Sequence, residues 1–258
     1  MITAEDTVRR TPSLANVRIS SQTVRRRLRE SRIRARRPVV GPIHRTARLA
    51  WVRARRRWRL HTWQHILVSD ESRFSLRFSD GRYRVYRRRG ERFTDQCVYE
   101  SDRFGGGSVM VWAGICHASR TQLNIVQGTL NAVKYRDDIL DPIVLPFLQQ
   151  RIFDHVFQHD NARCHVARIC QRLSEQNHIH VLPSPAISPD LSPIEHLWDE
   201  LGRSVGHRQN PPETLQKVRD SLMHEWNNIP QAFIQRLVGS MRRRCEAVVA
   251  ERGDHTRY

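Results

Sequence analysis

The chain of 258 residues has no apolar run approaching the roughly 18 residues of a membrane-spanning helix, and its start lacks the apolar stretch of a secretory signal. We therefore expect a soluble, intracellular protein without a membrane partner. Lysine is almost missing. Of the 44 basic residues only Lys134 and Lys217 are lysines, and the other 42 are arginines.

Paired cysteine spacing is also absent. The five cysteines show no CxxC pair, which argues against a disulfide framework. Cys164 stands close in sequence to His155, His159 and His165, a composition that suggests zinc. Four ligands at the spacing of a zinc finger are missing, so we do not expect a zinc site.

Charge is the dominant property that is present. The formal net charge is +18 and the pI is about 11.2, which favours nucleic acid as the partner and an acidic membrane surface as the second choice. Arginine can bind phosphate oxygens with two parallel hydrogen bonds, which lysine cannot do. Codon bias would produce the same excess of arginine, so the excess alone does not decide between the two explanations.

The first 40 residues are polar and rich in arginine. A serine cap at Ser20 or Ser21 predicts a helix over residues 23–31, with Val24 and Leu28 as a thin apolar stripe. It fits the recognition helix of a helix-turn-helix, and a solvated basic helix or arm is the alternative. The candidate DNA-binding residues are Arg25, Arg26, Arg27, Arg29, Arg34, Arg36 and Arg37.

The rest of the chain alternates between strand and helix patterns, which predicts an α/β fold. We expect strands at 66–69, 74–78, 108–115, 123–126, 155–160 and 179–182, with a hairpin turn at 80–81. We expect helices at 46–63 and 135–150, from Asn161, from Ser192–Pro193, at 213–227 and at 231–252. Arginines 242–244 in the last helix are further candidates for contacts with a DNA backbone.

Three acidic residues stand where a two-metal nuclease needs them. Asp70 and Asp160 end predicted strands, and Glu195 opens a predicted helix. Each also has an ordinary explanation. Asp70 could belong to a turn, Asp160 could bond to the helix that follows it, and Glu195 could complete a capping box with Ser192.

Taken together, the three acids favour a shared site. Strand-to-helix connections gather residues at the carboxyl ends of strands, where Asp70 and Asp160 are expected. Three carboxylates can hold two divalent cations about 3.5–4 Å apart, the arrangement that phosphodiester chemistry uses.

Three sequence blocks, at 68–74, 158–165 and 188–198, resemble the signature blocks of Tc/mariner-type DDE transposases. Thirty-four residues separate Asp160 from Glu195, which is similar to the spacing of the Tc branch. Segments 104–112 and 226–230 are also similar to that family, and so is 21–30. The resemblance extends from about residue 20 to the C-terminus.

This resemblance implies an RNase H-like mixed sheet flanked by helices, with a small all-α basic remnant of a helix-turn-helix at the N-terminus. It implies that Asp70, Asp160 and Glu195 are the catalytic acids and bind two Mg²⁺ or Mn²⁺ ions. The expected partners are double-stranded DNA, namely inverted-repeat ends and a TA target, and a second copy of the chain in a homodimer. The expected location is the nucleus.

The expected domains are a partial helix-turn-helix at 1–40, a basic linker helix at 41–65, a catalytic domain at 66–210 and C-terminal helices at 211–258. The start departs from the family pattern, because only the end of the second helix-turn-helix unit is recognisable, so the sequence predicts an N-terminal truncation. The alternatives are a catalytically silent DNA-binding relic, a cellular RNase H-like nuclease and a basic structural or membrane-surface protein.

Overall fold

The computed structural model describes residues 40–76, 107–150 and 156–258. The chain forms two compact units, Met1–Gly41 and Pro42–Tyr258, and the helices and strands described below belong to the second. The predicted helix at 23–31, the seven arginines between 25 and 37 and the hairpin at 80–81 lie outside the described residues. Within the described ranges, no helix has the length and apolar character needed to cross a membrane.

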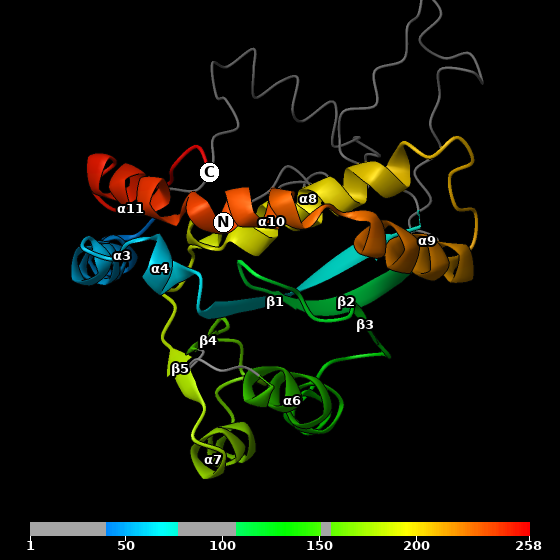
Figure 1. The fold of residues 1–258 in the computed structure, drawn as a ribbon, viewed down its shortest axis with the longest axis horizontal. Helices are drawn as coiled ribbons and strands as arrows, with labels where there is room; N and C mark the ends of the chain where they lie inside the picture. The colour runs from blue at the N-terminus through cyan, green and yellow to red at the C-terminus, as the bar shows by residue number, and fades with distance from the viewer. Residues whose placement is uncertain (1–39, 77–106, 151–155) are drawn as a thin grey trace, which may run out of the picture. The chain divides into compact units, whose positions relative to one another are not determined.

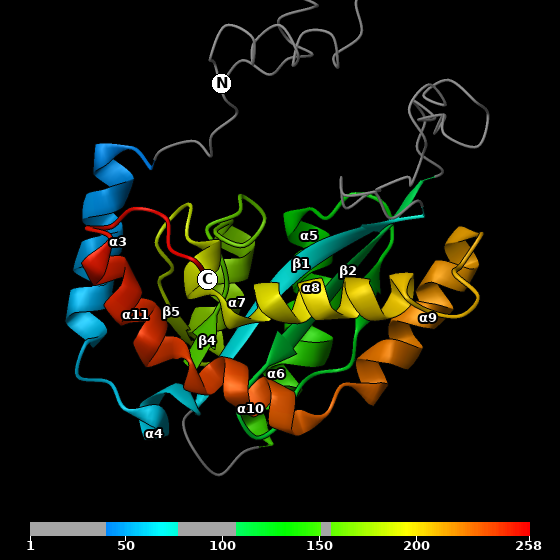
Figure 2. The same ribbon diagram turned by 90° about the horizontal axis from the view of Figure 1, so that it is seen from above.

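A mixed sheet of five strands, in the order β3-β2-β1-β4-β5, forms the centre of the second unit (Figures 1 and 2). β1 is antiparallel to β2 and parallel to β4, β2 is antiparallel to β3, and β4 is parallel to β5. The strands are β1 (Ile66–Ser75), β2 (Ser108–Ile115), β3 (Asn124–Val126), β4 (Val156–Gln158) and β5 (His180–Leu182).

β1 is one strand of ten residues, so the prediction of two short strands at 66–69 and 74–78 was wrong. Residues 68–75 pair with β2, from Val68 opposite Ile115 to Ser75 opposite Ser108. β4 pairs only with residues 66–68. Backbone pairing with β2 therefore keeps the polar residues in the middle of β1 in strand conformation. A local apolar pattern in the sequence does not reveal such pairing.

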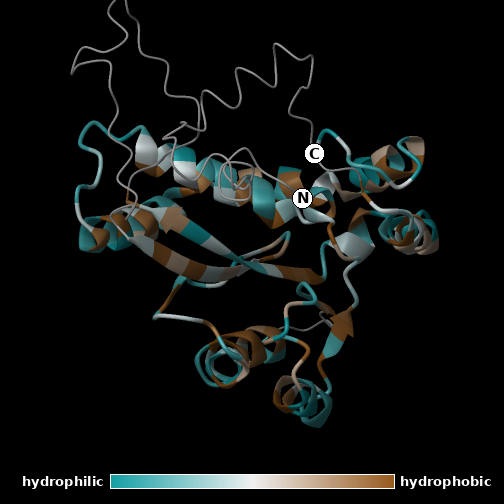
Figure 3. Cartoon of the chain, turned by 180° about the vertical axis from the view of Figure 1, so that it is seen from behind, coloured by the Kyte–Doolittle hydropathy of each residue, from teal (hydrophilic) through white to brown (hydrophobic). Residues whose placement is uncertain are grey.

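Helices cover both faces of the sheet, which confirms the predicted α/β class (Figure 1). One face packs against α8 and α9, and the other against η3, which is a π-helix, and α7. Figure 3 shows hydrophobic and hydrophilic residues alternating along the helices and hydrophobic stretches on the strands, with hydrophilic segments between them, as amphipathic elements around a core require. The principal helices are α3 (Pro42–Arg55), α4 (Leu60–Trp63), η3 (Tyr135–Val144), α6 (Leu145–Gln149), α7 (Arg168–Gln176), α8 (Pro193–Gly206), α9 (Leu215–Asn228), α10 (Gln231–Gly239) and α11 (Met241–Ala250).

Two predicted helices are each divided in the structure. The helix expected at 46–63 is α3 followed by the separate α4, and the helix expected at 231–252 is interrupted at Ser240 between α10 and α11. Across the break between α3 and α4, the tryptophans still pack into one cluster. The ring centroids of Trp51 and Trp58 lie 6.0 and 4.9 Å from that of Trp63, so the apolar pattern does not stop at the break. Periodicity alone therefore could not locate the break.

The helix predicted to start at Asn161 begins later, at Arg168, with Ala167 before it. Asn161 does not act as its cap. The side-chain amide of Asn161 instead donates to the backbone oxygen of Ser184 at 2.7 Å. This bond ties the loop after β4 to the loop after β5.

A buried ion pair fixes the loop that leads into α8. Both terminal nitrogens of Arg48, on α3, donate to the two carboxylate oxygens of Asp190, at 2.7 and 2.6 Å. The exposed fractions of the two side chains are 0% and 4%. Arg48 also donates to the backbone oxygens of Ile187 and Gly253, while Thr256 donates to Asp190. The pair therefore joins α3, the C-terminal segment and the start of α8 in one network.

Breaking this pair is expected to destabilise the fold strongly. Arg48→Met leaves the Asp190 carboxylate buried without its partner, which costs about 3–5 kcal/mol in the free energy of unfolding. Arg242→Met is the matched control, because its pair with Glu246 has exposed fractions of 66% and 61%. We expect that control to cost under about 1 kcal/mol. Urea unfolding followed by tryptophan fluorescence measures both, and equal losses would contradict the assignment.

Candidate active site

Asp70 and Asp160 lie beside each other across the parallel pair β1–β4. The register places Val68 opposite Gln158, and each acid follows two residues later. Asp160 therefore lies two residues beyond the end of β4. Asp70 lies inside β1, opposite Ala113 of β2, so its predicted place at a strand end was wrong. It remains only half-buried, because β4 has ended at this level of the sheet.

Glu195 reaches the same place from the first turn of α8, which packs on β1. Trp198, three residues later on α8, donates its indole N–H to Asp70 Oδ2 at 3.3 Å. Residues three apart share one side of a helix, so Glu195 lies one turn from that contact. Glu195 does not form the capping box that the sequence allowed. The backbone amide of Ser192 donates to the backbone oxygen of Pro189, and the Ser192 side chain makes no capping hydrogen bond.

The protonation of these acids shows that they interact. Burial raises the pKa of Asp70 to about 8, and the negative charges of Glu195, Glu71 and Asp160 contribute to the rise. Burial likewise raises the pKa of Glu195, with contributions from Asp199 and Asp160. Asp70 and Glu195 are therefore costly to ionise together, and a cation bound between them would relieve that cost.

The pKa of Asp160 is shifted in the opposite direction. A hydrogen bond with His165 lowers the pKa of Asp160, and the backbone amide of Ala162 donates to Asp160 Oδ1 at 2.8 Å. The ordinary explanation for Asp160 is thus partly right, since it does bond to the segment that follows β4. These bonds leave it ionised when Asp70 is still protonated.

The sequence did not predict the contacts that two residues, His165 and Glu71, make beside the acids. His165 Nδ1 lies 2.6 Å from Asp160 Oδ1, and His165 Nε2 lies 3.2 Å from Glu71 Oε1. Burial lowers the pKa of His165, but the hydrogen bonds with Asp160 and Glu71 outweigh it and raise the pKa to about 10. The sequence held a signal for Glu71. Successive residues of a strand point to opposite faces, so an acid directly after Asp70 must face the other side of the sheet.

The neighbouring His159 is held neutral instead. Burial and the charge of His165 lower the pKa of His159 to about 4. The two imidazoles are in contact, with ring centroids 5.1 Å apart. A charged His165 and a neutral His159 therefore lie next to each other beside Asp160.

The donor chemistry of the three acids fits a hard divalent cation, because carboxylate oxygens are the ligands that Mg²⁺ and Mn²⁺ prefer. As the side chains stand, no group of three His, Cys, Asp or Glu residues in the described part of the chain is placed to hold an ion. The raised pKa values of Asp70 and Glu195, which burial and neighbouring acids produce, are the observation that supports the fit. Metal binding would have to displace the proton of Asp70.

Among the arginines expected to contact DNA that lie in the described part of the chain, one has a structural role. Arg244 is buried, donates to the Asp190 backbone oxygen at 2.8 Å and to Ser240 Oγ at 2.8 Å, and lies over the ring of Tyr258. Burial lowers the pKa of Arg244 to about 10. Its predicted contact with DNA was therefore wrong, whereas Arg242 and Arg243 are exposed.

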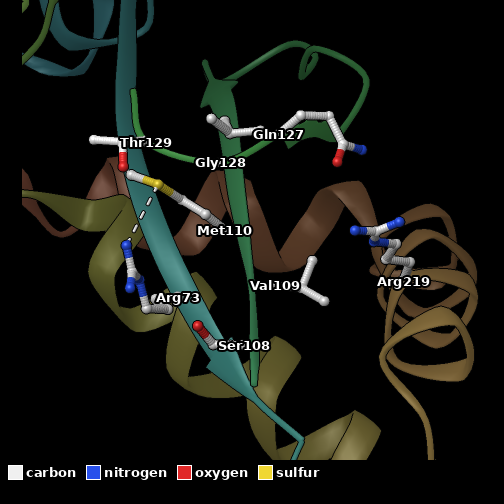
Figure 4. A pocket seen from close by; sticks show the side chains of 9 residues that line it. Arg73, Ser108, Val109, Met110, Gln127, Gly128, Thr129 and Arg219 are labelled. Atoms are coloured by element: carbon white, nitrogen blue, oxygen red, sulfur yellow. Dashed lines mark hydrogen bonds between the residues drawn. The ribbon is translucent and has the colours of Figure 1, made fainter. Parts of the chain in front are cut away.

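A pocket that is not lined by the three acids lies beside β2 and the turn after β3. This pocket has a volume of about 230 Å³, and Arg73 and Arg219 enter it from opposite sides of β2 (Figure 4). The buried Nε of Arg219 has no hydrogen-bond partner in the described structure. Ser108 and Thr129 add hydroxyls, and the other lining residues are Val109, Met110, Val126, Gln127 and Gly128. The described lining contains no carboxylate, so its chemistry suits an anion.

The sequence is similar to a family described as DDE superfamily endonuclease, which matches residues 65–217. The chain is 36% identical to the Transposable element Tc1 transposase of Caenorhabditis elegans over 244 residues, which cover 93% of this chain and 88% of that protein. It is 30% identical to the Tc3 transposase of the same species over 197 residues, which cover 76% of this chain and 59% of that protein.

Solved structures of Mos1 transposase have the same fold. The Mos1 catalytic domain with Raltegravir and Mg matches with a TM-score of 0.62 and 20% identity, covering 84% of this chain and 98% of that one. A Mos1 paired-end complex with the left transposon end matches with a TM-score of 0.69 and 22% identity, covering 98% and 75%. The predicted RNase H-like fold is thereby confirmed.

The raised pKa of Asp70 leads to a prediction about stability and pH. The folded protein binds a proton at Asp70 between pH values of about 4 and 8, whereas the unfolded chain has lost it, so without metal the stability should fall as pH rises through this range. Asp70→Asn cannot ionise and keeps an acceptor for Trp198. We expect the variant to be more stable than the wild type at pH 8, by at least about 1.4 kcal/mol, with a smaller difference at pH 5.

Chemical unfolding in EDTA at both pH values measures this difference. Asp220→Asn, an exposed acid on α9, is the control and should change stability little at either pH. A loss of stability in Asp70→Asn that is the same at pH 5 and pH 8 would show that Asp70 is not held protonated.

Proposed function

Because the chain belongs to the Tc/mariner family of DDE transposases, we propose that it cuts DNA at inverted-repeat ends and joins the freed 3′-hydroxyl to target DNA at TA sites. The observation that carries this proposal is the electrostatic coupling of Asp70, Asp160 and Glu195. They come from three segments far apart in the sequence. In addition to burial, the charges of Glu195 and Asp160 raise the pKa of Asp70, and the charge of Asp160 raises the pKa of Glu195. Such coupling is typical of a functional site.

We propose that these three acids hold two Mg²⁺ or Mn²⁺ ions. When bound, the ions would activate the attacking oxygen and stabilise the leaving oxygen of the phosphodiester. The protein contributes the arrangement of the ligands. The indole N–H of Trp198 orients Asp70, and His165 holds one oxygen of Asp160. Trp198 also stacks on Trp226, with ring centroids 5.6 Å apart, so an apolar wall borders the acids.

The proposed substrate is double-stranded DNA, and two copies of the chain are proposed to act on a pair of ends. The net charge of +18 supports a polyanionic substrate. The similar Mos1 structures include a paired-end complex with the left transposon end, which agrees with this choice. The pocket of Arg73 and Arg219 supplies a place for a backbone phosphate, because both guanidinium groups lack a carboxylate partner among the described residues.

The catalytic proposal is tested by metal-dependent nicking of a duplex that carries an inverted-repeat end. Asp160→Asn removes one proposed metal ligand and should lower the nicking rate by at least about 100-fold, which corresponds to about 2.7 kcal/mol of transition-state stabilisation. Asp220→Asn should keep the wild-type rate. A wild type no faster than Asp160→Asn, with DNA binding intact, would favour the silent relic. Cleavage without joining, and without preference for repeat ends, would favour a cellular nuclease.

The phosphate contact is tested by the salt dependence of DNA affinity. Arg219→Gln removes one proposed contact, so the slope of log affinity against log salt should become less steep by about 0.9. Arg172→Gln, which removes an exposed arginine on α7, is the charge-matched control and should leave the slope within error of wild type. Equal slopes for wild type and Arg219→Gln would remove the pocket from the DNA-binding surface.

A further inference from the structure

The geometry around His165 points to a role in the site other than that of a metal ligand. We infer that His165, held in turn by Glu71, is a positioning residue that sets the direction in which the Asp160 carboxylate faces the metal ions. The inference rests on the proposed function, because it assumes that Asp160 is a ligand. It extends the proposed function by naming the residues that hold this ligand in position.

Both ring nitrogens of His165 are engaged by acids. Nδ1 lies 2.6 Å from Asp160 Oδ1, and Nε2 lies 3.2 Å from Glu71 Oε1. Only 1% of the His165 side chain is exposed, against 58% of the Asp160 side chain. A buried group with fixed partners on two sides therefore holds an acid that is itself largely open to solvent. In metal sites such partners orient ligands and are worth about 10–100-fold in metal affinity or activity.

The ring of His165 has little freedom to turn. Tyr135 packs against it with ring centroids 4.1 Å apart and planes inclined by 36°, and His159 packs edge-on at 5.1 Å. Phe157 supports His159 at 5.2 Å. Aromatic residues from η3, β4 and the loop after β4 thus fix the plane in which Nδ1 points at Asp160.

The described bonds to the Asp160 side chain use one of its two oxygens. His165 Nδ1 and the Ala162 amide both bond to Oδ1. A carboxylate has acceptor sites on both oxygens, so Oδ2 stays available for another ligand. Holding Oδ1 from two sides fixes the direction of Oδ2 without occupying it.

The bond between His165 and Glu71 also links the two segments that carry Asp70 and Asp160. Glu71 follows Asp70 directly on β1, and it points to the opposite face of the sheet. His165 lies five residues after Asp160. The contact therefore connects the strand of one acid to the loop of the other at a level where β1 and β4 are no longer paired.

The test measures Mn²⁺ affinity by calorimetry, without DNA, for five variants and the wild type. His165→Ala should raise the Kd about 10–100-fold. His165→Asn places an amide nitrogen near the position of Nδ1 and should raise the Kd less than His165→Gln, whose nitrogen falls nearer to Nε2. Glu71→Gln keeps the hydrogen bond but removes the charge, so its effect should be smaller than that of His165→Ala. His180→Asn, at an exposed histidine of β5, is the control and should match wild type.

Crystal structures of the wild type, His165→Asn and His165→Gln provide a second readout that does not depend on metal. We expect Asp160 to keep its direction in His165→Asn and to lose it in His165→Gln. The inference is overturned if Asn, Gln and Ala raise the Kd equally, or if Asp160 faces the same way in all structures. A wild type that binds no Mn²⁺ would count against the proposed function, and the direction of Asp160 would then decide the positioning role by itself.

Discussion

The repulsion among three carboxylates is the constraint on which the rest of this molecule depends. The parallel register of β1 and β4 brings Asp70 beside Asp160, and the packing of α8 on β1 adds Glu195. Like charges gathered in a partly buried place raise the free energy of the fold. Burial first, and then the charges of Glu195, Glu71 and Asp160, raise the pKa of Asp70. A site that is costly when empty is suited to a cation, because the ion replaces repulsion by attraction.

Other parts of the structure hold the acids in place against this repulsion. The Arg48–Asp190 pair fixes the loop that precedes α8, and Arg244 donates to the backbone of the same loop. His165 lies between two acids, where it balances the charge of Asp160 and is held in turn by Glu71. The buried arginines and the buried histidine thus serve the same purpose, which is to keep segments that repel one another at fixed positions.

Much of the fold and of the candidate site could be predicted from the sequence, and the gaps have a physical cause. Strand β2 and the apolar stripe of α8 are local patterns, and the three acids stand within recognisable blocks. The length of β1 was missed because it depends on pairing with β2, about 40 residues away in the chain. His165, Glu71 and Arg48 were missed for the same reason, since each acquires its role from a partner that is distant in sequence. The predicted domain boundaries and the seven arginines at 25–37 remain predictions.

The central claim is that Asp70, Asp160 and Glu195 bind divalent cations together. Anomalous diffraction from crystals soaked in Mn²⁺ tests it most directly. The account predicts manganese peaks at the site, with oxygens from all three carboxylates among the ligands at about 2.0–2.3 Å. Peaks that contact only one of the acids, or a site that stays empty at saturating Mn²⁺ and a pH above 8, would contradict it.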